Sequence, residues 1–180
     1  MKSVLLKLAI LASLLIFVVG CSSGDTSRHD NSKSEETIRT VLKSIFTGPD
    51  EEQKKLFKIQ ATTDPQALTP YLEKKYKSLI EEQYLQEFLK NNQGTTWLQS
   101  AFMAGYQLKA AMPINVQKAK SGGYTFKFDV DYTKNGKTNA ATIIGDINTT
   151  SNGKVVAINV IDDDGLFKLL TSKTPIRHGK

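Results

Sequence analysis

The spacing of apolar residues changes part-way along the chain, and this change limits the folds that the chain can adopt. Up to about residue 106, apolar residues recur mostly every three or four positions, as on one face of an α-helix. From about residue 108 they alternate with polar residues, as in a strand with one buried face. No helical connection separates the alternating segments, so the sequence indicates an α+β domain with an antiparallel sheet.

Three helices are expected before the sheet. The first spans about residues 34–47, where the apolar residues share one helix face and Ser32 and Glu35 have the spacing of a capping box. A short second helix follows Pro49, which suits a first helical turn. A third, long helix is predicted over about residues 69–91.

The stretch between this helix and the sheet has no clear period. It contains Trp97, the only tryptophan of the chain, with Phe102 and Tyr106 close behind. These aromatic residues either pack in the core or form a pocket mouth or partner patch, because Trp and Tyr are favoured at interfaces. They are the candidate ligand or partner patch.

Four strands are expected in the second half of the chain. They cover about residues 108–117, 124–132, 138–149 and 155–161. Pro113 cannot donate a ladder hydrogen bond, so the first strand is expected at an edge or with a bulge. Asn135-Gly136 is typical of a hairpin turn between the second and third strands. The aromatic face of the second strand, with Phe128, is predicted to be buried, and the nearly continuous apolar fourth strand is predicted to be central or covered on both faces.

These elements indicate a single α+β domain over residues 35–173, followed by a polar tail at 174–180. Their order, with a long helix before the strands, resembles the nuclear-transport-factor-2-like fold. That resemblance implies a strongly curved sheet that wraps the helix and leaves a cone-shaped cavity. A cystatin-like sheet on a helix is the alternative. Non-enzymatic lipoproteins and enzymes such as ketosteroid isomerase both occur in this superfamily, so the fold alone does not decide function.

The N-terminus has the pattern of an export signal. A positively charged start precedes an apolar run from Leu8 to Val19, which is too short for a membrane span. The run ends at Cys21, the only cysteine, and Val18-Val19-Gly20-Cys21 resembles the lipobox of bacterial lipoproteins. The resemblance implies that residues 1–20 are a lipoprotein signal peptide and that Cys21 carries a diacylglycerol thioether. An uncleaved anchor and a free cysteine after an ordinary cleavage site are the alternatives.

A lipid on Cys21 makes the membrane the first expected partner. Two acyl chains give stable anchoring, which places the domain at the extracytoplasmic face of the cell membrane. Residues 21–34 are then the lipidated cysteine and a tether. The tether is predicted to be disordered, because it contains no aliphatic residue and no Phe, Tyr or Trp.

Several kinds of chemistry are not expected. A single cysteine excludes a disulfide within the chain and a zinc site of several thiolates. His29 and His178 lie outside the expected core, which argues against histidine catalysis. The run Asp162–Asp164 lacks the spacing of an EF-hand loop, and no phosphate-binding loop is present. We therefore expect no cofactor, no metal site and no catalytic residues, although Asp146 is a strand acid that an isomerase-like site could use.

The net charge of the chain limits the partners that are expected. Cleavage removes Lys2 and Lys7 and leaves a net charge of +4, from 22 basic and 18 acidic residues. No run of five or more Lys and Arg appears, so nucleic-acid binding is not expected. The sequence predicts a non-catalytic, lipid-anchored binding or assembly module for an unknown protein or small ligand. An isomerase- or hydrolase-like enzyme and a structural spacer of a surface complex are the alternatives.

Overall fold

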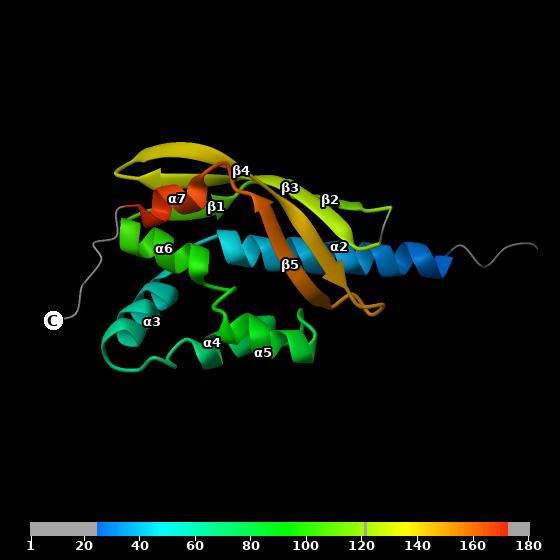
Figure 1. Cartoon of the computed structure of the whole chain (residues 1–180), viewed down its shortest axis with the longest axis horizontal. Helices are drawn as coiled ribbons and strands as arrows, with labels where there is room; N and C mark the ends of the chain where they lie inside the picture. The colour runs from blue at the N-terminus through cyan, green and yellow to red at the C-terminus, as the bar shows by residue number, and fades with distance from the viewer. Residues whose placement is uncertain (1–24, 121, 173–180) are drawn as a thin grey trace, which may run out of the picture.

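The computed structural model describes residues 25–120 and 122–172. Within them the chain forms six helices and one antiparallel sheet of five strands, which confirms the α+β class (Figure 1). The helices are α2 (Asp25–Phe46), α3 (Glu51–Thr62), α4 (Thr69–Tyr76), α5 (Glu82–Lys90), α6 (Thr96–Ala104) and α7 (Leu166–Thr171). The strands are β1 (Gln107–Ala110), β2 (Asn115–Lys118), β3 (Tyr124–Lys134), β4 (Lys137–Thr149) and β5 (Val155–Asp162). Five described helices, rather than the predicted three, precede the first strand.

Helix α2 begins earlier than predicted. It starts at Asp25, so the prediction of a disordered tether is wrong for residues 25–34. The side chains of Asn31 and Ser34 contact one end of the sheet: Lys118 Nζ donates to Asn31 Oδ1 at 2.9 Å, and Thr149 Oγ1 donates to Ser34 Oγ at 3.3 Å. These tertiary contacts stabilise a helical turn that the polar local sequence does not favour.

The predicted long helix at 69–91 is two helices. Helix α4 ends at Tyr76, and α5 begins at Glu82. Between them, Ile80 forms a parallel bridge with Val155 of β5, in which Val155 N–H donates to the carbonyl of Leu79 at 2.9 Å. The helix is interrupted because this segment pairs with the sheet, a contact that helical periodicity does not reveal.

One edge of the sheet agrees with the sequence. The strand order is β1-β3-β4-β5, and β2 also pairs with β3. Strands β1 and β2 are the two halves of the predicted strand at 108–117, interrupted around Pro113, so the predicted edge position is confirmed. The β3–β4 turn has positive φ angles at Asn135 and Gly136, as the Asn-Gly pair predicts.

The other edge differs from the prediction. Strand β5 pairs with β4 alone among the strands, and Val155 is its only buried residue. The prediction of a strand that is central or covered on both faces is therefore wrong. The apolar side chains of β5 face the helices that pack at this edge of the sheet. Helix α5 packs against β5, which explains why an edge strand contains so many apolar residues.

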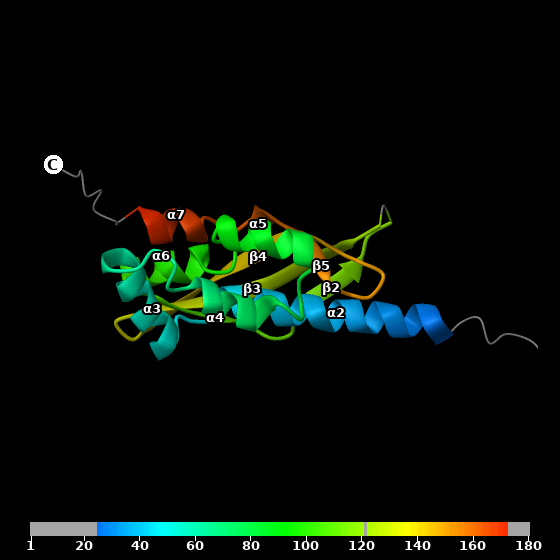
Figure 2. The same ribbon diagram turned by 90° about the horizontal axis from the view of Figure 1, so that it is seen from below.

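The sheet curves around α2. Helix α2 contacts β1 and β2 at one edge and β5 at the other, as the two views show (Figures 1 and 2). The register of β4 against β5 shifts at two places, and such bulges increase twist. The N-terminal part of α2 extends beyond the strands in both views.

The core lies between α2 and the inner face of the sheet. Phe128 is buried there, as the strand pattern predicts, and Leu166 and Leu170 of α7 are buried as well. In the described ranges, no helix combines the length and the apolar character required for a membrane crossing.

Candidate functional site

An apolar cavity of about 220 Å³ lies between β5 and the helices α2, α5 and α6. Each of the three helices contributes one aromatic ring, and β5 contributes two aliphatic side chains. The polar groups in the lining are one side-chain amide and one hydroxyl. The lining residues are Ile45, Phe46, Phe88, Gln93, Thr96, Trp97, Ile158 and Val160.

A cluster of aromatic rings in tilted and edge-to-face contact lies at one wall of this cavity. The ring centre of Trp97 lies 4.9 Å from that of Phe46 and 5.1 Å from that of Phe167 in α7. Phe46 in turn lies 5.4 Å from Phe128 of β3. Because four elements contribute rings to this cluster, the indole of Trp97 is held against the core while remaining partly exposed.

The loop between α5 and α6 approaches the core closely. A Cβ atom at Gly94 would lie 2.7 Å from Phe88 Cε1 and 3.0 Å from Tyr76 Cε2, so only glycine fits there. This close approach brings Gln93 and Thr96 to the cavity. The hydroxyl of the buried Tyr76 has no hydrogen-bond partner among the described residues, and burial raises its pKa.

Tyr84 connects this loop to the sheet. Its hydroxyl donates to Gln93 Oε1 at 2.6 Å and accepts from the N–H of Ile158 at 3.2 Å. The Tyr84 hydroxyl is protonated at neutral pH and can donate, and burial raises its pKa further. Tyr84 therefore fixes one end of the cavity against the edge of β5.

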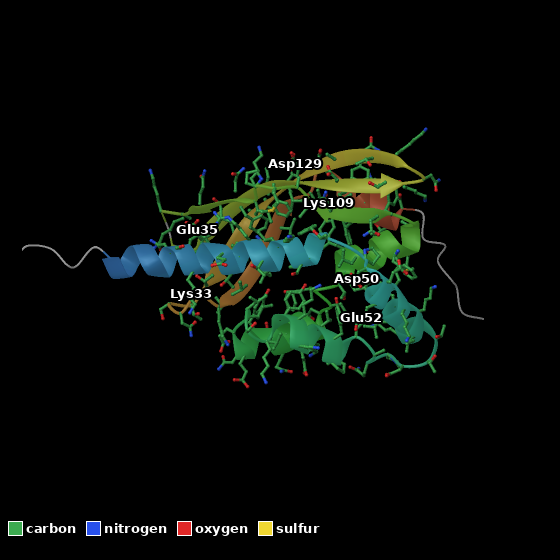
Figure 3. All side chains as sticks on the ribbon, turned by 180° about the vertical axis from the view of Figure 1, so that it is seen from behind. Lys33, Glu35, Asp50, Glu52, Lys109 and Asp129 are labelled. Carbon is green, nitrogen blue, oxygen red and sulfur yellow. The ribbon has the colours of Figure 1, made fainter. Side chains whose placement is uncertain are left out.

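The lining suits binding by burial of apolar groups. General acid–base catalysis needs a titratable group within reach of the substrate, and the lining residues include no carboxylate, amine or imidazole. Asp146, the strand acid that an isomerase-like site could use, is exposed. Asp129 lies on the side of the sheet away from α2, where it accepts from Thr142 Oγ1 at 2.7 Å (Figure 3).

The three aromatic residues of the predicted patch lie in two places. Trp97 lines the cavity beside β5. Phe102 and Tyr106 line a separate hollow of about 290 Å³, in which Lys134 Nζ lies 5.0 Å from the Tyr106 ring centre. The structure therefore does not bring the three residues into one patch. Cys21 lies outside the described residues.

Sequence reasoning did not single out the β5 side of the cavity. Ile158 and Val160 were expected in a strand that is central or covered on both faces, a position that does not suggest a cavity lining. Tyr84 was not singled out within the helix predicted at 69–91. Apolar periodicity marks residues as buried, but it does not show which of them face a space that the protein's own side chains leave unfilled.

A polar cluster lies elsewhere, between α3 and α4. Lys75 Nζ donates to Tyr71 Oη at 3.3 Å, and burial lowers the pKa of this lysine. Burial, with the nearby carboxylates of Asp50 and Glu52, raises the pKa of Tyr71 to about 12. Figure 3 shows both carboxylates at the start of α3. None of these residues lines the cavity beside β5.

Comparison with known proteins gives little further information. No protein-family model matches the chain, and no curated protein matches it significantly. Among solved structures, the chain is similar to the NMR solution structure of the protein TraH from the Gram-positive conjugative plasmid pIP501. The two share 17% sequence identity with a TM-score of 0.47, over 73% of this chain and 93% of that chain.

Proposed function

We propose that the protein is a lipid-anchored, extracytoplasmic binding or assembly module and that the cavity beside β5 is its binding site. The observation that carries this proposal is the lining of the cavity, which combines a partly exposed tryptophan with aliphatic and aromatic side chains and two neutral polar groups. Such a lining holds an apolar group and orients it through a few hydrogen bonds. The module is non-catalytic in this proposal.

The membrane anchor of the proposal is the lipid on Cys21. Helix α2 starts at Asp25 and is packed in the domain from Ser34 onward, so residues 25–33 add about 14 Å of helix before the packed part. Most of the connection between the lipid and the packed domain is then helical. We also propose the nuclear-transport-factor-2-like fold for this domain, supported by the curvature of the sheet around α2 and by the cavity.

Replacing Cys21 by alanine tests the anchor. We expect the Cys21→Ala chain to lose the lipid and to remain as an unprocessed precursor, because both steps require the thiol. Membrane fractionation and mass spectrometry of the N-terminus measure these effects, with Ser22→Ala as the matched control. Mature protein of normal mass from the Cys21→Ala chain would contradict the proposal.

The cavity is tested with the dye anilinonaphthalene sulfonate. Trp97 is the only tryptophan and lines the cavity, so energy transfer from its indole to the dye reports binding there. We expect Val160→Phe, which fills part of the cavity, to weaken dye binding about tenfold, equivalent to ~1.4 kcal/mol.

The matched control for this test is Ile161→Phe, because Ile161 is the next residue of β5 and its side chain is 61% exposed. This variant is expected to bind the dye like the unchanged chain. If Val160→Phe also binds the dye as tightly as the unchanged chain, the dye occupies another place, and the cavity is not the binding site.

A further inference from the structure

We propose that the partner bound at the cavity is an extended peptide segment. Its main chain pairs with the outer edge of β5, one apolar side chain enters the cavity, and basic residues lie beside Asp162–Asp164. This inference rests on the proposed function, because it names the chemistry of the group that the cavity binds.

The outer edge of β5 is only partly paired. At its start, Val155 exchanges hydrogen bonds with the segment Leu79–Glu81, with Val155 N–H donating to Leu79 O and Glu81 N–H donating to Val155 O, both at 2.9 Å. Further along, the N–H of Ile158 donates to the hydroxyl of Tyr84. Hydrogen bonds from other elements to this edge of β5 therefore extend as far as Ile158.

Val160 is the next residue whose main chain points outward. Ile158 turns its N–H away from β4, and the register runs without a shift from Ile158 to Val160, so the main chain of Val160 points in the same direction. No described residue outside β4 pairs with the N–H or C=O of Val160. An exposed strand edge of this kind accepts a further strand.

The cavity begins where this free edge begins. The side chains of Ile158 and Val160 line it, so a peptide paired with Val160 lies at its mouth. Alternate residues of an extended peptide point to the same face, which directs one side chain into the cavity. The volume of about 220 Å³ lies below the roughly 300–1,000 Å³ of typical small-molecule pockets and suits a single side chain.

The charge next to the free edge favours a basic peptide. Asp162, Asp163 and Asp164 follow Val160 closely, and Asp162 Oδ1 accepts from the N–H of Asp164 at 3.0 Å. Neither ion pair found in the described ranges involves these three carboxylates. Lys or Arg next to the apolar residue of the peptide would therefore meet carboxylates that form no ion pair within residues 25–120 and 122–172.

A second copy of this chain fits the edge less well. Antiparallel pairing of two β5 strands about Val160 would place Ile158 of each copy opposite Asp162 of the other. The N–H of Ile158 is already bound by Tyr84. The free stretch is therefore too short for symmetric pairing, whereas a separate peptide can end before Ile158.

A synthetic peptide tests the proposal. The probe is a fluorescein-labelled peptide of alternating Thr and Val that ends in two arginines, mixed with the full-length chain in detergent micelles. We expect saturable binding by fluorescence anisotropy, with a change in the emission of Trp97. A peptide N-methylated on its edge-facing residues and one with glutamates in place of the arginines are each expected to bind about tenfold more weakly.

Variants of the protein test the same contacts. Val160→Pro removes an N–H that does not belong to the β4 ladder, a change that an edge strand tolerates, and is expected to weaken peptide binding at least as much as N-methylation. Asp162→Asn keeps the acceptor for Asp164 N–H but removes the charge, and should weaken binding of the arginine peptide alone. Asp146→Asn is the control, because this acid is exposed on another strand.

The outcomes separate this inference from the proposed function. If the dye enters the cavity but the peptide does not bind, or if N-methylation has no effect, the peptide inference is wrong and the binding site remains. If neither the dye nor the peptide binds at the cavity, the peptide inference and the proposed binding site are both wrong. Peptide binding only after removal of residues 173–180, or dimerisation that Val160→Pro abolishes, would assign the edge to this chain itself and overturn the inference.

Discussion

Replacing Phe128 by alanine is expected to lower the free energy of unfolding by about 3–5 kcal/mol. The Phe128 side chain is 3% exposed, and its ring centre lies 5.4 Å from Phe46 and 6.0 Å from Phe126. Its removal costs the burial of the ring and leaves a space that the curved sheet cannot close, because β3 is paired on both sides. Urea unfolding followed by circular dichroism measures the change.

Lys127→Ala is the control for this variant. Lys127 is the preceding residue of β3, and its side chain is exposed on the other face of the sheet. The substitution is expected to change the free energy of unfolding by less than about 0.5 kcal/mol. A loss below ~1 kcal/mol for Phe128→Ala would mean that the faces of β3 are assigned the wrong way round.

Replacing Gly145 by alanine is expected to destabilise the protein by about 3 kcal/mol, the upper end of the usual range for overpacking. A Cβ atom at this position of β4 would lie 2.2 Å from the carbonyl oxygen of Asn159 and 2.5 Å from Phe126 Cζ. The first neighbour is backbone of β5, so the two strands must separate or the bulge between them must rearrange. Thermal unfolding of the two chains gives the difference.

Asp146→Ala provides the comparison for Gly145→Ala. It places the same methyl group one residue further along β4, at an exposed position. We expect nearly unchanged stability. Nearly unchanged stability of Gly145→Ala as well would show that β4 and β5 are not in van der Waals contact at this point.

The sequence predicted the parts of the fold whose residues depend on close neighbours in the chain. The alternation of aromatic and polar residues placed β3, and the Asn135-Gly136 turn joined it to β4. Pro113 marked an edge, because a residue without an N–H cannot sit in a central strand. The buried face with Phe128 followed from the same alternation.

The errors arose where distant segments meet. Residues 25–34 are helical because Asn31 and Ser34 contact the end of the sheet. The helix predicted at 69–91 is broken because Ile80 pairs with Val155, and that same pairing helps to explain the apolar character of an edge strand. Hydrophobic periodicity records burial, and it does not record which segment provides the cover.

The candidate site shows the same division. The sequence marked Trp97 as a candidate for binding but grouped it with Phe102 and Tyr106, which line a different hollow. Ile158, Val160 and Tyr84 join Trp97 only through the packing of α5 and α6 against β5.

By itself, the sequence determined the α+β class, the β3–β4 hairpin and the buried face of β3, because these depend on alternation and turn chemistry within a few residues. Only the tertiary structure decided that β5 lies at an edge, that α4 and α5 are separate helices and that a cavity remains between β5 and Trp97. These features result from contacts between segments far apart in the chain, where packing and hydrogen bonding outweigh local preference.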